Sequence, residues 1–133
     1  MTDATPTAQP AWMTWTGRVL SALPVLMMTM GVASVLFNRS QAAEGMAKFG
    51  WQERALTLIL ALEIGSALIY LIPRTSVLGA ILLTGYFGGA VATHLRVGDP
   101  GWPTAVVCGV LAWAGLFLRD PRLRVLLPFR RPR

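Results

Sequence analysis

The chain has 133 residues, of which 54% are hydrophobic and only 14% are charged. Water-soluble domains carry about 25% charged residues, so this composition indicates that much of the protein surface faces lipid. The formal net charge is +6, and half of the twelve Lys and Arg residues lie in the last fifteen positions. This distribution excludes a nucleic-acid-binding surface spread over the molecule and indicates a basic tail beside a membrane.

The first sixteen residues are polar and rich in Pro and Thr. We expect residues 1–16 to form a flexible tail, with Trp12 and Trp15 anchored at the lipid headgroups. A first membrane span is predicted over residues 17–37, because about 20 apolar residues suffice to cross the hydrocarbon core. Pro24 lies in the first third of this span and is expected to kink the helix.

Residues 38–52 combine charged and apolar side chains in an amphipathic pattern. This pattern predicts a short helix on the membrane surface, which Gly50 is expected to end. Three more apolar segments follow, separated by charged residues and turn-forming Pro and Gly. The predicted spans are 55–72, 76–95 and a fourth helix from about residue 103 to 118. The sequence therefore predicts an all-α membrane four-helix bundle over residues 17–118, with an interfacial helix between its first two spans and a basic tail over 119–133.

The Lys and Arg residues near the ends of the spans predict the orientation. With four spans, both termini and the turn at 73–75 share one side of the membrane, which holds Arg18, Arg74 and the six tail arginines. The opposite side holds only Arg39, Lys48, Arg54 and Arg96. The positive-inside rule then places both termini in the cytoplasm. The tail is expected to anchor this topology, or else to lie flat on anionic lipid.

Glu63 is the one ionisable residue inside the second predicted span, and it lies near the span's centre. An ionised acid at that depth costs about 2.5–3.5 kcal/mol on insertion scales, so it must face the bundle interior or remain protonated. Ser66 and Tyr70 follow at helical spacing and are candidate hydrogen-bond partners. Two interpretations stay open: a proton-exchanging or ligand-binding group, and a structural carboxyl that holds two helices together.

His94 is the only histidine and lies at the end of the third predicted span. We place it at the outer mouth of the Glu63 site, where it could titrate, ligate a metal or contact a quinone; the simpler alternative is an interfacial polar residue. A single histidine cannot supply both axial ligands of a haem within one subunit, and the sequence has no metal-binding motif. The single cysteine, Cys108, cannot form an intrachain disulfide or a redox pair.

The third predicted span is rich in small residues, some of them four positions apart. Such small-xxx-small patterns let membrane helices approach backbone to backbone, so we expect these residues to pack helices together. The residues are Gly79, Gly85, Gly88, Gly89 and Ala92.

Several segments resemble the DoxX-like membrane family, and the resemblance covers about residues 17–127. They are EIGSALIYLIPR at 63–74 with LGA at 78–80, LTGYFGGAVATHLR at 83–96 with GDP at 98–100, and RDPRLR at 119–124. The resemblance implies a four-helix bundle in a bacterial cytoplasmic membrane. It places Glu63 at the family's intramembrane acidic position and matches residues 85–94 to its glycine-rich third helix. The chain departs from many relatives at residues 37–39, where they have a Gly-x-x-Lys pattern.

The family takes its name from a subunit associated with a thiosulfate:quinone oxidoreductase. The resemblance therefore implies an accessory or binding subunit rather than an enzyme, with quinone as the one suggested cofactor. Redox proteins or a second copy of the chain are the expected partners within the bilayer. A proton-coupled small-molecule transporter is the alternative, because small multidrug exporters also combine four spans with one embedded acid. Those exporters carry the acid in the first helix, whereas this chain carries it in the second. A stand-alone membrane enzyme is a third hypothesis.

Overall fold

A computed structural model describes residues 9–126, and the side chains of residues 9–124. These residues form six helices: α1 (Ala11–Phe37), α2 (Arg39–Lys48), α3 (Glu53–Leu71), α4 (Ser76–Arg96), α5 (Trp102–Arg119) and α6 (Pro121–Leu126). Helices α1, α3, α4 and α5 are long and apolar enough to cross a membrane. No strand occurs in residues 9–126. The predicted all-α membrane bundle is confirmed.

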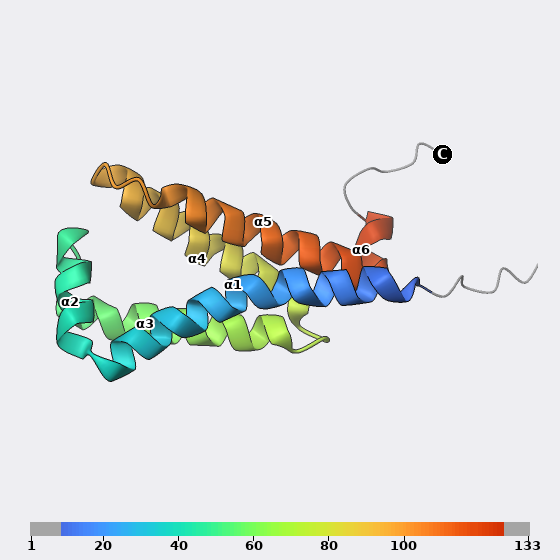
Figure 1. Ribbon diagram of the computed structural model, residues 1–133, viewed down its shortest axis with the longest axis horizontal. Helices are drawn as coiled ribbons and strands as arrows, with labels where there is room; N and C mark the ends of the chain where they lie inside the picture. Colours follow the sequence, from blue (N-terminus) through green and yellow to red (C-terminus); the bar gives the residue numbers. More distant parts are fainter. Residues whose placement is uncertain (1–8, 127–133) are drawn as a thin grey trace, which may run out of the picture.

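The four long helices lie alongside one another and run alternately in opposite directions (Figure 1). Neighbouring contacts join α1 to α5, α5 to α4, and α4 to α3, whereas α1 and α3 touch over a smaller area. Figure 1 shows α4 and α5 diverging from α1 and α3 toward one end. We call this the α2 end, because α2 and the α4–α5 turn lie there. The opposite end, where α1 begins and α5 finishes, is the terminal end.

Helix α1 starts at Ala11, six residues before the expected start of the first span. No Gly or Pro lies between Pro10 and Gly17, so the helix continues outward through Trp12 and Trp15. Helix α1 runs through the buried Pro24 without a break, and Figure 1 shows it bending part-way along its length. Residues 1–8 of the predicted tail lie outside the described residues.

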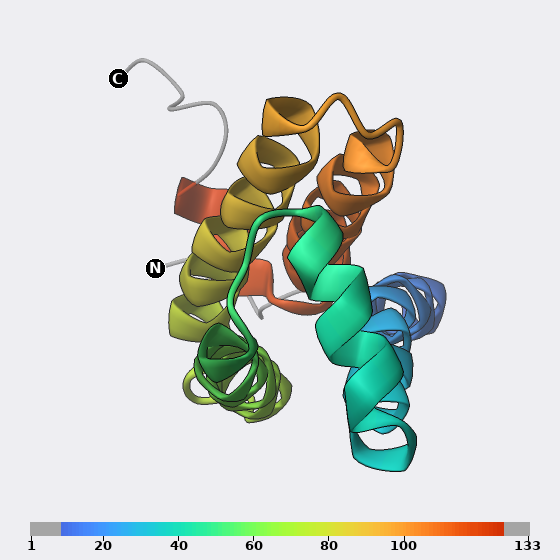
Figure 2. The same cartoon turned by 90° about the vertical axis from the view of Figure 1, so that its left-hand side faces the viewer.

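Helix α2 runs across the long helices rather than along them (Figures 1 and 2). The Asn38 side chain caps its start by accepting a hydrogen bond of 3.2 Å from the backbone N–H of Gln41. Gly50 follows its last turn with a φ of 74°, the left-handed conformation that glycine adopts most easily. Helix α2 has no buried residue. The short helix expected between the first two spans therefore forms.

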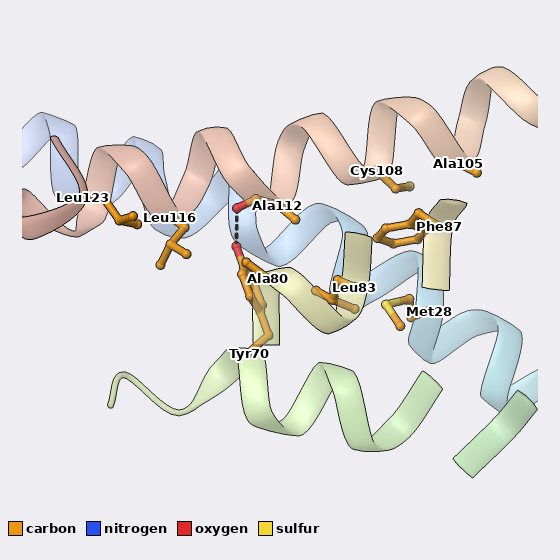
Figure 3. Packing of buried hydrophobic residues seen from close by; sticks show 10 residues of the cluster. All are labelled: Met28, Tyr70, Ala80, Leu83, Phe87, Ala105, Cys108, Ala112, Leu116 and Leu123. Atoms are coloured by element: carbon orange, nitrogen blue, oxygen red, sulfur yellow. Dashed lines mark hydrogen bonds between the residues drawn. The ribbon is translucent and has the colours of Figure 1, made fainter. Parts of the chain in front are cut away.

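The packed core extends along the bundle, from Leu123 of α6 at the terminal end to Ala105 in the first turn of α5 (Figure 3). Its centre is Tyr70 of α3, which is completely buried. The Tyr70 hydroxyl donates to the carbonyl oxygen of Ala112 at 2.7 Å and hydrogen-bonds with the Ser21 hydroxyl at 2.8 Å. These two bonds join α3 to both α5 and α1. Apolar side chains from α1, α4, α5 and α6 complete the cluster: Met28, Ala80, Leu83, Phe87, Ala105, Cys108, Leu116 and Leu123.

Two sets of glycines bring the backbones together around this core. A Cβ atom on Gly115 of α5 would lie 2.4 Å from Oγ of Ser21 and 2.8 Å from the carbonyl oxygen of Gly17, both in α1. A Cβ atom on Gly79 of α4 would lie 2.2 Å from Cα of Tyr70 in α3. Real Cβ atoms are not found at such distances, so both helix crossings require glycine. The terminal half of the bundle is therefore closely packed.

Candidate functional site

Glu63 lies in the central part of α3, and its side chain is buried, with 8% of its surface exposed. The carboxyl lines a cavity of about 290 Å³ on the α2 side of the packed core, which we call the Glu63 cavity. The walls of this cavity come from four helices: Gly31, Ser34 and Val35 of α1; Ala42, Gly45 and Met46 of α2; Leu56, Ile59 and Leu60 of α3; and Tyr86 of α4. The acid predicted from the sequence therefore faces the interior of the bundle.

Tyr86 of α4 lines the same cavity as Glu63, and its phenol group is the polar group from another helix that lies beside the carboxyl. The two salt bridges within residues 9–126 join Arg39 to Glu53 and His94 to Asp99, so no cation among these residues neutralises Glu63. A carboxyl paired with a phenol can both donate and accept hydrogen bonds when it is protonated. The pair is thus suited to bind a neutral polar group or to exchange a proton.

Ser66 and Tyr70, the partners expected from helical spacing, do not contact the Glu63 carboxyl through a hydrogen bond. The Ser66 hydroxyl donates to the carbonyl oxygen of Leu62, one turn back in its own helix, at 2.6 Å. The Tyr70 hydroxyl is used in the core, where it bonds to Ala112 and Ser21. Both residues are buried, but their role in the structure is to support the helices rather than to share a polar site with Glu63.

His94 is half-buried at the end of α4, and its Nδ1 lies 2.6 Å from Oδ2 of Asp99. The same oxygen accepts a hydrogen bond of 2.7 Å from the backbone N–H of Gly101. These bonds hold the pKa of Asp99 below its ordinary value, the Gly101 bond contributing most and His94 next. The ring of Phe49 meets the His94 imidazole edge to face at 4.8 Å between centroids. His94 therefore joins the α4–α5 turn to the segment after α2.

A second cavity, of about 360 Å³, extends between His94 and Tyr86, and we call it the His94 cavity. Its other lining residues are Met46, Phe49, Trp51, Ile59, Leu62, Gly85, Gly89, Ala90 and Thr93. Tyr86 lines both this cavity and the Glu63 cavity. His94 and Glu63 therefore line different cavities, which share Met46, Ile59 and Tyr86 in their linings.

The small residues of α4 divide into two groups. Gly79 packs against α3, as expected, but a Cβ atom on Gly85, Gly88 or Gly89 would meet nothing within 4 Å. Ala92 is exposed. The prediction that these four residues pack helices together is therefore wrong within a single copy of the chain. Gly85 and Gly89 instead line the His94 cavity, where the absence of side chains leaves space.

Tyr86 is the functional candidate that the sequence did not reveal. Its only sequence signal is that it is one of two tyrosines in the chain, each placed in an apolar segment. Its pairing with Glu63 depends on how α3 and α4 are rotated, which no spacing within one helix reports. No group of three or more His, Cys, Asp or Glu side chains that could hold a metal ion occurs in the part of the chain from residue 9 to residue 126.

Comparison with known protein families gives a match over most of the chain. The model of the DoxX-like family matches residues 19–115, which is more than half of the chain. No curated protein and no solved structure matches significantly. The matched region begins in α1 and ends in α5, so it includes α3 and α4, most of α1 and α5, both cavities, Glu63 and Tyr86. This small helical membrane protein therefore belongs to the DoxX-like family.

Proposed function

We propose that the chain is a binding subunit of the membrane, and that the Glu63–Tyr86 pair is its ligand site. The observation that carries this proposal is a carboxyl in the middle of a spanning helix, without a counter-cation among the described residues, beside open space. Ionisable groups inside a membrane are costly and usually serve a function. A purely structural carboxyl would instead be enclosed by partners that satisfy it, as Tyr70 is by Ala112 and Ser21.

The ligand that we propose is a quinone headgroup. A quinone ring is flat and apolar and carries two carbonyl oxygens that only accept hydrogen bonds. The protonated Glu63 carboxyl and the Tyr86 hydroxyl supply donors on one side, and the His94 imidazole lies across the second cavity. Gly85 and Gly89 are exposed and have open space beside them, which leaves room for a ligand to enter from the lipid.

A proton-coupled transporter is the second candidate, because the embedded acid and the adjacent cavities on either side of Tyr86 would suit proton exchange. Transport also requires access from the Glu63 cavity to the terminal end. In this conformation the packed layer around Tyr70, Leu116 and Ala112 occupies that route. The arrangement therefore favours binding over transport by a single copy of the chain.

The cellular setting forms part of the proposal. We place the protein in a bacterial cytoplasmic membrane with both termini in the cytoplasm, because Lys and Arg are concentrated at the terminal end. Within that membrane it would act beside a quinone-linked redox protein, as the family resemblance implies, or together with a second copy. The arginines of the tail would contact anionic lipid; residues 127–133, which include three of them, lie outside the described structure.

Quinone binding can be measured by titrating the purified protein in detergent with decylubiquinone and following tryptophan emission. Trp51 lines the His94 cavity, so a bound quinone should quench its fluorescence, and Trp51→Phe should remove that component. Glu63→Leu deletes a hydrogen-bond donor and should weaken binding about fivefold or more. Glu44→Leu is the matched control, because Glu44 is an exposed acid on α2.

Glu63→Gln separates the two candidate functions. The glutamine amide still offers a hydrogen-bond donor but cannot exchange a proton at neutral pH. A binding site should retain much of its quinone affinity in this variant, whereas proton-coupled dye uptake by reconstituted vesicles should disappear. Quenching that is equal in the wild-type protein, Glu63→Leu and Glu44→Leu would show only that the quinone partitions into the detergent, and would overturn the proposal.

A further inference from the structure

A third cavity, of about 320 Å³, lies at the terminal end, away from the Glu63–Tyr86 pair. It is enclosed by the start of α1, the α3–α4 turn and the junction of α5 with α6. Its polar lining consists of Thr14, Arg18, Ser76, Arg119, Asp120 and Arg122. Three arginines from two separate parts of the chain thus line one space.

The charges around this cavity are not balanced within the described residues. Asp120 is the single acid in the lining, and its Oδ1 accepts a hydrogen bond of 2.9 Å from the backbone N–H of Arg122, at the start of α6. None of the three arginines forms a salt bridge with any group among residues 9–126. The cavity therefore has an excess of positive charge, which favours an anionic occupant.

Arg119 is the most constrained of the three. One terminal nitrogen donates to the carbonyl oxygen of Tyr70 at 3.2 Å, and the guanidinium carbon lies 4.9 Å from the centroid of the Tyr70 ring. Its Nε is buried and has no hydrogen-bond partner within the described residues. A buried donor of a charged group without a partner is costly. Arg119 therefore adds to the cavity wall a positive charge that has no carboxylate partner among the described residues.

We propose that this cavity binds the phosphate group of an anionic phospholipid. Arginine suits this ligand because the planar guanidinium can donate two parallel hydrogen bonds to phosphate oxygens. The cavity lies where the spanning helices end, and Pro73 and Leu116 give it apolar walls that could receive the glycerol part of a lipid. Trp12 and Trp15 are exposed on the same end of α1, as side chains at headgroup depth often are.

Native mass spectrometry of the full chain in detergent can test this site. The ligands are dioleoylphosphatidylglycerol, dioleoylphosphatidylcholine and inorganic phosphate, each titrated separately. We expect the anionic lipid to be retained preferentially, and Arg18→Gln and Arg122→Gln each to weaken its binding about fivefold. Arg119 is left unchanged, because its bond to Tyr70 would confound loss of binding with loss of structure.

Arg74→Gln is the matched control. Arg74 has the same charge and lies at the same end of the bundle, but it does not line the cavity. If it weakens lipid binding as much as Arg122→Gln, attraction by surface charge explains the result and the site is overturned. Equal retention of the anionic and zwitterionic lipids would also overturn it. Saturable binding of inorganic phosphate that Arg122→Gln weakens, without a preference for the anionic lipid, would assign the cavity to a free phosphate instead.

Discussion

Gly31 of α1 and Glu63 of α3 face each other directly: a Cβ atom on Gly31 would lie 3.2 Å from Oε1 of the carboxyl. Helices α1 and α3 touch over a smaller area than the other neighbouring pairs of long helices. The missing side chain at position 31 therefore helps to leave room for the carboxyl and its cavity. A larger side chain at position 31 would therefore occupy the Glu63 cavity while Glu63 itself stays unchanged.

Gly31→Leu should place a side chain in the Glu63 cavity and reduce the affinity for decylubiquinone about tenfold, equivalent to about 1.4 kcal/mol. The fold should persist, because leucine favours the helix over glycine by roughly 1 kcal/mol. Tryptophan quenching measures the affinity and circular dichroism the helix content. Gly65→Leu is the control, since a Cβ atom on Gly65 meets nothing within 4 Å. An equal loss in both variants would contradict a role for the cavity.

The two tyrosines should respond differently to removal of the hydroxyl. Tyr70→Phe leaves the Ala112 carbonyl and the Ser21 hydroxyl without their buried partner, and should lower the free energy of unfolding by about 1 kcal/mol. Tyr86 lines two cavities, so Tyr86→Phe should alter stability less but weaken quinone binding. Thermal unfolding in detergent and quinone titration of both variants would check this contrast. The reverse pattern would mean that Tyr86 is the structural residue.

Gly79 and Gly88 of α4 provide a matched pair of small residues. Gly79→Ala would force α3 and α4 apart, because its Cβ would lie 2.2 Å from Cα of Tyr70, and should cost about 3 kcal/mol or more. Gly88→Ala meets open space and should be neutral or stabilising by up to about 1 kcal/mol in a single copy. The free energies of unfolding of the two variants, measured in dodecyl maltoside, would test this difference. Strong destabilisation by Gly88→Ala would reveal a helix interface that forms between copies.

Asp99 should make the α4–α5 turn sensitive to acid. The folded-state pKa of this carboxyl is lower than its ordinary value of 3.8, so its bonds to Gly101 and His94 stabilise the turn above that value. The stabilisation should be lost as the pH falls through the lowered pKa. The amide proton shift of Gly101, followed by NMR, should titrate with a midpoint below 3.8. Asp99→Asn should abolish this titration, and a midpoint above 3.8 would contradict the prediction.

The positions of the spanning helices followed closely from hydropathy. The third span was predicted at 76–95 and forms α4, Ser76–Arg96, while the second was predicted at 55–72 and forms α3, Glu53–Leu71. The end of α2 at Gly50 followed from the conformational freedom of glycine. Hydropathy alone does not locate the start of α1, because the mixed polar and apolar residues before Gly17 contain no Gly or Pro after Pro10 and continue the helix to Ala11.

The candidate site could be predicted only in part. Glu63 was identifiable because a carboxyl within an apolar span is costly wherever the helix packs. Its partner was not, because Ser66 and Tyr70 share its helix stripe whereas Tyr86 reaches it from another helix. The glycines of α4 are equally small in the sequence, and only their position relative to α3 separates Gly79 from Gly88.

By itself, the sequence determined that this protein belongs in a membrane, how many times it can cross, and that one acid must be accommodated inside. These properties depend on transfer from water to hydrocarbon, which sums along a segment and needs no knowledge of neighbouring helices. Only the tertiary structure decided that Tyr86 lies beside Glu63, that Tyr70 forms a hydrogen bond in the centre of the core, and that three arginines line one cavity at the terminal end. Such contacts depend on helix rotation and crossing, which emerge only when the whole bundle packs.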